Sequence, residues 1–209
     1  MKIRQEKPAE YQAVERLTYQ AFKELNLTEN WRPTEHFIVH LLRESANFIP
    51  ELSLVSETNQ GKLTGHIMSS KAKLRLPDHT EKAVLTVGPL SVHPEAQNTG
   101  VGSALIKHSV QKAKELGVGG LIIMGHPTYY TKFGFVPATT FQITLPEKET
   151  SEALLALELL PGYFGTSGGE WHFSTCFAYP ETHLAELEAF EAELGIKNNK
   201  TRQPLVKYW

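Results

Sequence analysis

Several features that define classes of protein are scarce or missing in this sequence. Its 209 residues include one cysteine, Cys176, which excludes an intramolecular disulfide and a cysteine-rich zinc site. No apolar run is long enough to span a bilayer, and the first residues, MKIRQEKPAEYQ, lack the apolar core of a signal peptide. Lysine and arginine are scattered and the formal net charge is −2, so the basic surface typical of nucleic-acid binding is absent. We expect a soluble, cytoplasmic protein that binds neither nucleic acid nor membrane.

Internal repeats, low-complexity segments and composition shifts of the kind that mark a linker are also missing. Hydrophobic residues make up 41% of the chain, enough for one α/β domain of ordinary size. We therefore predict a single domain over residues 1–209.

Hydrophobic periodicity predicts two helices and a hairpin in the first part of the chain. Residues 9–22 have apolar positions at helical spacing, and Thr34 is the expected N-cap of a second helix. The segments ELSLVSE and KLTGHIMSSKAKL then follow a period of two around the turn signal at residues 59–61. They predict an antiparallel hairpin.

A strand, a helix and a second strand are expected next. KAVLTVGPLSV at 82–92 is the first strand, residues 100–116 the helix, and GGLIIMG at 119–125 the second strand. Because a helix connects them, the two strands are expected to be parallel. The pattern predicts an α/β (α+β) fold, with helices flanking a mixed sheet.

Beyond Gly134 the pattern is weaker. FVPATTFQIT at 135–144 and EWHFSTCFAY at 170–179 favour strands, and ALLALELL at 153–160 fits helix or strand. Residues 182–194 alternate leucine and glutamate at helical spacing and predict a helix. Residues 198–209 show no periodicity.

A glycine-rich stretch, QNTGVG at 97–102, stands between the predicted strand and the predicted helix. Free N–H groups and the helix dipole make a helix N-terminus attractive to anions, and glycines let a phosphate approach the main chain. An ordinary tight turn is the alternative interpretation. A dinucleotide fingerprint would need a third glycine where Leu105 stands, and a P-loop would need a lysine after Gly102, where Ser103 stands.

The dipeptide Gly88-Pro89 interrupts the strand that leads into this loop. Proline has no N–H for a sheet ladder, so it marks a bulge or an edge. A bulge here would splay the strand from its parallel neighbour. The main chain of Leu90 to Val92 would then be free to pair with a ligand that carries amides of its own.

Together these motifs resemble the GNAT superfamily of N-acetyltransferases. The superfamily's Gln/Arg-x-x-Gly-x-Gly/Ala loop is matched by Gln97, Gly100 and Gly102, and its later Tyr-x-x-x-Gly-Phe signature by Tyr130, Gly134 and Phe135. The matching pieces cover roughly residues 84–137. The stretches GPLSVHPEAQNTGVG and GHPTYYTKFGF resemble a bacterial branch whose members mostly have no assigned substrate. The strands and helix expected in 138–209 lie beyond these core motifs.

The resemblance implies a site for acetyl-CoA as co-substrate, with no metal required. The pyrophosphate would rest on main-chain N–H groups of residues 98–103, and the pantetheine arm would pair like a strand with residues 90–92. The implied cofactor-binding residues are Leu90, Ser91, Val92, Gln97, Asn98, Thr99, Gly100, Val101, Gly102 and Ser103.

Tyr130 matches the tyrosine that often protonates the departing sulfur in this superfamily. A phenol with a pKa near 10 keeps its proton at neutral pH and can donate it. Aromatic packing with Tyr129 is the alternative role. The thioester oxygen would be met by a main-chain N–H, that of Val92 or a neighbour. One departure is Ile123, where many relatives carry an asparagine near the cofactor.

The general base is not determined by the sequence. His93, His66, Glu95 and Glu35 are candidates, and a chain of water molecules is an equal one. Residues 31–33, Trp-Arg-Pro, stand where relatives line the acceptor pocket, although ordinary loop packing fits them too. Cys176 is interpreted as a packing residue rather than a nucleophile.

The leading hypothesis is therefore an enzyme that moves an acetyl group from CoA to a primary amine of a small molecule or protein. The alternative is a CoA-binding sensor or regulatory module without turnover, because a fold does not guarantee chemistry. An unrelated nucleotide-binding protein is a third hypothesis, weakened by the failed fingerprints. The amine acceptor is unknown from sequence, and the assembly, a homodimer for example, is left open.

Overall fold

A mixed sheet forms the centre of the molecule in the computed structural model, which describes residues 1–25 and 32–197. The strand order is β1-β2-β3-β4-β5-β8-β6, and β9 pairs with β3 and β7. Within the described residues the strands are β1 (Lys2–Gln5), β2 (Phe48–Glu57), β3 (Leu63–Arg75), β4 (Glu81–Val92), β5 (Gly120–Met124), β6 (Val136–Pro137), β7 (Ile143–Thr144), β8 (Leu154–Glu158) and β9 (Gly169–His172). All neighbours in the central path are antiparallel except β4 and β5. The fold class expected from the sequence is confirmed.

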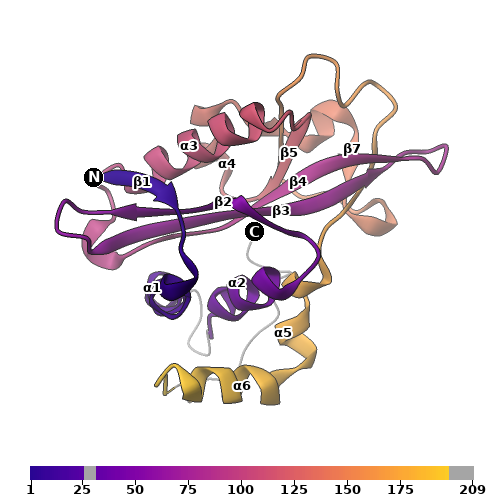
Figure 1. The fold of residues 1–209 in the computed structure, drawn as a ribbon. Coiled ribbons are helices and arrows are strands. Elements are labelled where there is room, and N and C mark those ends of the chain that lie inside the picture. Colours follow the sequence, from indigo (N-terminus) through magenta and orange to yellow (C-terminus); the bar gives the residue numbers. More distant parts are fainter. Residues whose placement is uncertain (26–31, 198–209) are drawn as a thin grey trace.

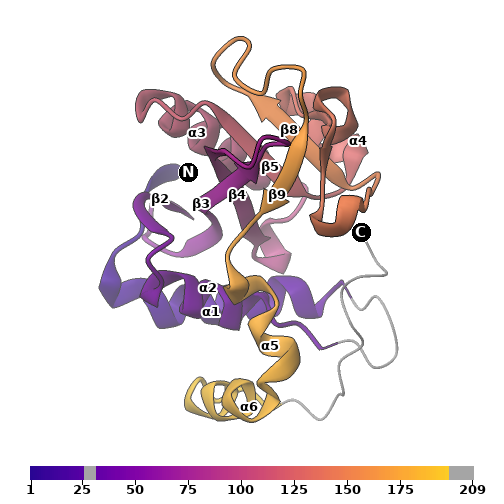
Figure 2. The same cartoon turned by 90° about the vertical axis from the view of Figure 1, so that its right-hand side faces the viewer.

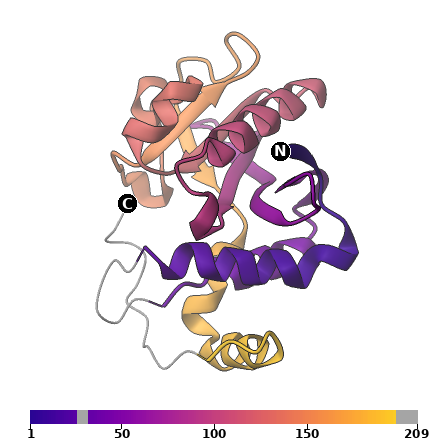
Figure 3. The same cartoon turned by 90° about the vertical axis from the view of Figure 1, so that its left-hand side faces the viewer.

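Helices cover both faces of this sheet. The α-helices of the described residues are α1 (Tyr11–Lys23), α2 (Glu35–Glu44), α3 (Val101–Glu115), α4 (Pro127–Tyr130), α5 (Tyr179–Thr182) and α6 (Leu184–Glu193). Figures 1 and 3 show α3 on one face of the sheet and α1 with α2 on the other. No helix in the described part of the chain combines the length and apolar character that crossing a membrane requires.

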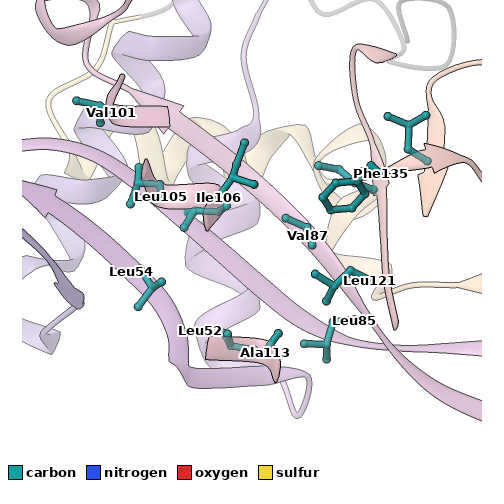
Figure 4. Packing of buried hydrophobic residues seen from close by; sticks show 13 residues of the cluster. Leu52, Leu54, Leu85, Val87, Val101, Leu105, Ile106, Ala113, Leu121 and Phe135 are labelled. Atoms are coloured by element: carbon teal, nitrogen blue, oxygen red, sulfur yellow. The ribbon is translucent and has the colours of Figure 1, made fainter. Parts of the chain in front are cut away.

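The main hydrophobic core lies between α3 and the sheet. Leu105 and Ile106 of α3 pack on side chains from β2, β4 and β5, as Figure 4 shows. Val101, Leu105 and Ala113 of α3 are also buried, and Val110 is partly buried. The burial of this apolar face holds the start of α3 against the end of β4.

The bulge expected at Gly88-Pro89 is present. Val87 pairs with Ser69 and Leu90 with Ile67, so Gly88 and Pro89 together stand opposite the single residue Met68. Their peptide bond is cis. An extra residue bends a strand and increases its twist. The parallel ladder between β4 and β5 accordingly has two registered pairs, at Leu85 and Thr86, and then ends.

The first part of the chain matches the sequence predictions. Helix α2 begins after Thr34, and β2 and β3 form the expected antiparallel hairpin. The Thr34 side chain makes no cap hydrogen bond, however. Its main-chain N–H instead donates to Oε2 of Glu35 at 2.9 Å. Thr34 is therefore the N-cap residue, as predicted, without a hydrogen bond from its side chain.

Two segments predicted as strands are largely not strands. In 135–144 the strands β6 and β7 have two residues each and flank a 3₁₀ helix, Ala138–Phe141. Phe141 turns inward onto Phe164, with ring centroids 4.8 Å apart, and this long-range contact overrides the local strand preference. In 170–179 the strand ends at His172, because the Ser174 side chain accepts from the N–H of Cys176 and begins a helical turn.

The C-terminal segment descends from the sheet to the outer side of α2. Figure 2 shows β9 leading through α5 to α6 beneath α1 and α2. The helix expected over 182–194 is confirmed as α6, and the ambiguous stretch 153–160 contains β8. Arg32 joins α6 to the start of α2 through a buried ion pair with Glu191, Nη2 to Oε2 at 2.7 Å. Residues 198–209 lie outside the described residues.

Candidate active site

A cavity of about 770 Å³ opens where β4 and β5 separate. Its lining includes residues 86–92 of β4, residues 123–126 at the end of β5, and parts of α1 and α2. The predicted site residues Leu90, Ser91, Val92, Gln97 and Tyr130 all line this cavity. Residues 98–103 are not part of the lining and lie next to it, at the start of α3.

The main chain of β4 beyond the bulge presents hydrogen-bonding groups to the gap. The N–H of His93 donates to the carbonyl of Thr64 on β3 at 2.9 Å. Because antiparallel pairs alternate, the N–H and C=O groups of Leu90 and Val92 point away from β3, toward the side where β5 has separated. The Val92 carbonyl there accepts a hydrogen bond from Nε2 of Gln97 at 3.4 Å.

Ser91 has the opposite orientation. Its side chain is buried and its Oγ lies 3.0 Å from Oγ1 of Thr18 on α1. This contact fixes the bulged end of β4 against α1. Ser91 lines the cavity, and its hydroxyl serves the packing of α1 on β4.

The loop before α3 exposes the first turn of that helix. Gly100 has a φ of +89°, which favours glycine, and a Cβ at this position would find no atom within 4 Å. Thr99 donates its hydroxyl to the carbonyl of Ala96 at 2.6 Å, which holds the turn. The first hydrogen bond into the helix runs from Ala104 to the carbonyl of Gly100. The N–H groups of residues 101–103 precede it and are the orphan donors of a helix N-terminus, a geometry that suits an anion.

Gly102 is small for a second reason, which the sequence did not indicate. A Cβ there would lie 2.6 Å from the hydroxyl oxygen of Tyr129 and 3.4 Å from Cγ2 of Val92. Tyr129 therefore reaches over the first turn of α3, and it also lines the cavity. Tyr129 therefore contacts the start of α3 in addition to Tyr130, its neighbour in the sequence.

Tyr130 is half-buried at the end of α4. Its ring lies against Gly125, where a Cβ would come within 2.3 Å of the ring, and meets Tyr129 edge-on with centroids 5.1 Å apart. Burial, with a smaller contribution from Tyr129, raises the pKa of Tyr130 above the ordinary value for a phenol. The hydroxyl therefore holds its proton across the physiological pH range, as a proton donor must.

Of the four side chains named as candidate bases, Glu35 alone lines the cavity. His66 is fully buried with Nε2 3.1 Å from Oγ of Ser53, and burial lowers its pKa well below the usual range. Glu95 is exposed and paired with Lys62 at 2.7 Å. His93 accepts the N–H of Glu95 at the turn after β4.

The other described residues that the sequence singled out are partly or fully buried by packing. Arg32 is buried against α6 and does not line the cavity, and Trp31 lies outside the described residues. Cys176 is half-buried and packs against the cluster that contains Val14 and Ile38. Ile123, the departure from the family's asparagine, is buried and lines the cavity.

The far wall of the cavity was not found by sequence reasoning. It is formed by residues 145–151, by β9 and by the turn into α5, and includes Trp171, Phe173, Phe177, Glu149 and Glu181. His126 was missed as well, although the GHPTYY motif contains it. These residues form no motif, because they converge from segments that are far apart in the sequence. Among the described residues, no group of three histidine, cysteine or acidic side chains is placed to hold a metal ion.

The splayed strands, the exposed helix start and the tyrosine signature occur in one stretch of chain. Residues 2–138 match the family model of the acetyltransferase (GNAT) domain. The chain belongs to the GNAT acetyltransferase family. The matched range of this GNAT chain contains β4, α3, β5 and Tyr130, and it ends before residues 145–151 and the segment from β9 to α6.

Curated relatives are themselves uncharacterised N-acetyltransferases of Escherichia coli. YjhQ of strain K12 is 33% identical over 100 residues, covering 48% of this chain and 54% of YjhQ. That match spans about half the length of the relative. YhbS of the same strain is 25% identical over 178 residues, covering 83% of this GNAT chain and 99% of YhbS.

Solved structures show the same fold. The crystal structure of E. coli YhbS in complex with CoA has a TM-score of 0.74 at 21% identity, covering 85% of this chain and 91% of that one. A GNAT acetyltransferase from Brucella melitensis in complex with acetyl-CoA has a TM-score of 0.67 at 26% identity, covering 84% and 97%. The resemblance inferred from the sequence motifs is thereby confirmed at the level of family and fold.

Proposed function

We propose that this protein is an acetyl-CoA-dependent N-acetyltransferase that acetylates a primary amine by direct attack in a ternary complex. The observation that carries the proposal is one cavity that is lined by the separated edge of β4 and by Tyr130, with the start of α3 next to it. Relatives crystallised with CoA and acetyl-CoA support it.

In this proposal the loop before α3 and the edge of β4 bind different parts of acetyl-CoA. The N–H groups of residues 98–103 bind the pyrophosphate, and the outward groups of Leu90 and Val92 pair with the amides of the pantetheine arm. Gln97 braces the end of β4 through the Val92 carbonyl. The N–H of Val92 is the donor proposed for the thioester oxygen.

Acetyl-CoA supplies the thioester carbonyl that the amine attacks. The amine nitrogen bonds to this carbon, the C–S bond breaks, and the proposed proton donor to the thiolate is Tyr130. The ammonium must first lose a proton, which costs about 4–5 kcal/mol at pH 7 for a lysine-like amine. Alignment of the two reactants lowers the barrier by about 7 kcal/mol or more. We assign the amine's proton to Glu35, directly or through one water, because this residue is 5% exposed and lines the cavity.

Calorimetry with acetyl-CoA in the presence of a chelator tests the first step. We expect binding without metal, and no heat at millimolar acetyl-CoA would end the acetyltransferase proposal. A panel of amines, with free thiol as the readout, then separates the enzyme from the alternative, a CoA-binding sensor. Binding without thiol release from any amine would favour the sensor.

The chain offers a matched pair of variants for the proposed phosphate loop. Gly100 and Gly117 flank α3, both have positive φ, and a Cβ would meet nothing within 4 Å at either. Gly100→Val and Gly117→Val should therefore cost similar stability, and only Gly100→Val should weaken acetyl-CoA binding, by about tenfold or more. Equal affinities in the two variants would make the loop a plain turn.

A further inference from the structure

A buried glycine, Gly65, lies within β3 directly opposite Val92, the last residue of β4. Gly65 also pairs with Ser56 of β2, so it occupies an interior position of the sheet. Glycine weakens a strand, because it loses more conformational freedom on folding than other residues and has no side chain to pack. The φ of Gly65 lies outside the left-handed region, so the backbone conformation at this position does not require glycine. The requirement must therefore come from the space around it.

Helix α3 occupies the space that a side chain at position 65 would fill. A Cβ there would lie 2.8 Å from Cγ1 of Val101, 2.9 Å from Cδ1 of Leu105 and 3.0 Å from the carbonyl oxygen of Ser91. Carbon atoms in contact are normally about 3.5–4.0 Å apart, so a methyl group would have to displace its neighbours by about 1 Å. Val101 and Leu105 are buried in the main core (Figure 4), where close packing leaves little room for such a shift.

The first turn of α3 also rests on Val92, the strand partner of Gly65. A Cβ at Gly102 would lie 3.4 Å from Cγ2 of Val92, so the side chain of Val92 lies beneath the helix start. The main-chain groups of Val92 point into the gap beside β5, because the neighbouring pair, His93 and Thr64, makes the hydrogen bond between β3 and β4. One residue thus supports α3 with its side chain and presents its main chain to the slot.

The two parts of the proposed acetyl-CoA site therefore meet at one helix–strand contact. The start of α3 is the proposed pyrophosphate site, and the end of β4 is the proposed partner of the pantetheine arm. A single ligand spans both, so their separation has to match the length of that ligand. A misplacement of about 1 Å in a binding site can cost as much as about 10²-fold in rate. The space left by Gly65 is what allows α3 to lie this close to β4.

We propose that Gly65 is a positioning residue for acetyl-CoA. The absence of a side chain at this position fixes the distance between the start of α3 and the end of β4, and this distance determines the affinity for the cofactor. Gly65 does not line the cavity and touches no ligand, so it acts through Val101 and Val92. This inference rests on the proposed acetyltransferase function, since it concerns the acetyl-CoA site of that same cavity.

Gly65→Ala tests the proposal, and Gly120→Ala is the matched control. Gly120 is a buried strand glycine whose φ also lies outside the left-handed region, and a Cβ there would lie 2.3 Å from the ring of Phe164. Neither Gly120 nor Phe164 lines the cavity. Both substitutions should lower the midpoint of urea unfolding, but only Gly65→Ala should weaken acetyl-CoA binding in calorimetry, by about tenfold. Wild-type affinity in Gly65→Ala, or an equal loss in both variants, would overturn the proposal.

A compensating substitution separates positioning from a general loss of structure. Val101→Ala in the Gly65→Ala background removes Cγ1, the atom nearest to the new methyl group, and keeps the main-chain N–H of residue 101. The Cδ1 of Leu105 is the end of a flexible side chain and can turn aside. The double variant should therefore recover most of the lost acetyl-CoA affinity. An affinity as low as that of Gly65→Ala alone would contradict the assigned contact.

If Gly65→Ala does not fold, Val101→Ile brings an extra carbon into the same contact from the helix side. Its control is Val110→Ile, a partly buried valine of the same helix that packs on the same core. Acetyl-CoA binding should be weaker in Val101→Ile than in Val110→Ile, and equal affinities would overturn the proposal.

Calorimetry distinguishes a failure of this inference from a failure of the proposed function, because it needs no turnover. A wild-type protein that does not bind acetyl-CoA would end both. Wild-type binding that Gly65→Ala retains in full would end the positioning role alone and leave the proposed function intact.

Discussion

Two adjacent tyrosines, Tyr129 and Tyr130, lie in the same cavity with different surroundings. Tyr130 rests on Gly125 and its hydroxyl has a raised pKa because it is buried. The Tyr129 hydroxyl reaches Gly102 at the start of α3. The sequence singles out Tyr130 by its place in the signature, and the structure shows that Tyr129 lies against Gly102 whereas Tyr130 lies against Gly125.

Tyr130→Phe keeps the ring and removes the proposed proton donor. We expect acetyl-CoA affinity to change little, because the hydroxyl acts chiefly in the transition state. Turnover should fall by about 10²-fold, the low end for a lost general acid. Single-turnover thiol release measures this. Tyr129→Phe serves as the comparison and should keep the wild-type rate; wild-type turnover in both variants would make Tyr130 a packing residue.

Gly102 and Tyr129 are predicted to be coupled. Gly102→Ala places a Cβ 2.6 Å from the Tyr129 hydroxyl, and the next atoms of the ring and of Val92 are at 3.8 and 3.4 Å. We expect the single substitution to cost about 1–2 kcal/mol of stability, and Tyr129→Phe to relieve most of it. A double-mutant cycle in urea unfolding gives the coupling. Additive effects would show that the hydroxyl is not the obstacle.

At the scale of elements, the attachment of α6 depends on buried charge. Arg32 and Glu191 are both buried, and Nε2 of His36 lies 3.3 Å from Oε1 of Glu191. Burial alone would raise the pKa of Glu191, but His36 and Arg32 more than offset it and the pKa lies below the ordinary value. The carboxylate is therefore charged and holds α6 against α2.

Glu191→Gln should destabilise the protein by about 3 kcal/mol, because it leaves the Arg32 guanidinium buried without its countercharge. Thermal unfolding measures the loss. Glu188 pairs with the same guanidinium at 3.4 Å but is 65% exposed, so Glu188→Gln should cost about 0.5 kcal/mol or less. A small loss in both variants would mean that α6 is held by the apolar contacts of Leu187 and Phe190 instead.

The β4 bulge is the element that opens the site. The ladder with β5 ends after Thr86, whereas β5 continues to pair with β8 as far as Met124. The gap therefore lies on one side of β5 only, and β8 keeps the strand in the sheet while β4 turns away. The cavity therefore forms while β5, which carries its other edge, stays paired in the sheet.

For the whole molecule, buried histidines set the pH dependence of stability. Burial lowers the pKa of His66 and of His36, and both imidazoles are fully buried. Below pH about 6.5 the unfolded chain takes up these protons and the folded protein does not. The free energy of unfolding should therefore fall as pH falls from 6.5 toward the folded pKa values, by up to about 1.4 kcal/mol per pH unit for each histidine.

His40 acts in the opposite direction. Its hydrogen bond with Glu15 raises the pKa of His40. The contribution of His40 to the free energy of unfolding is therefore complete below pH about 6.5 and is lost as pH rises through the folded pKa. Urea unfolding of the wild type and of His66→Gln at pH 7, 6 and 5 isolates one buried histidine. The wild type should lose stability more steeply than the variant; parallel lines would show that His66 does not contribute.

The sequence by itself determined the parts of this protein that are local. The break at Gly88-Pro89, the loop 97–102 and the signature around Tyr130 are each contained in a few consecutive residues. Proline removes a ladder donor, glycine permits positive φ, and a helix start exposes N–H groups wherever they occur, so these consequences follow without a fold. Family, fold class and the splayed strands were predictable for this reason.

Only the tertiary structure decided the far wall of the cavity and the surroundings of individual side chains. Trp171, Glu149 and Glu181 share a cavity because β9 pairs with β3, residue 74 with residue 171, across about half the chain. Two of the candidate bases are disfavoured by their surroundings, because His66 is buried and Glu95 forms an ion pair. Neither the burial nor the ion pair can be recognised from the neighbouring residues in the sequence. Periodicity reports which residues prefer the interior, whereas a site depends on which distant segments close on the same space, and long-range packing alone determines that.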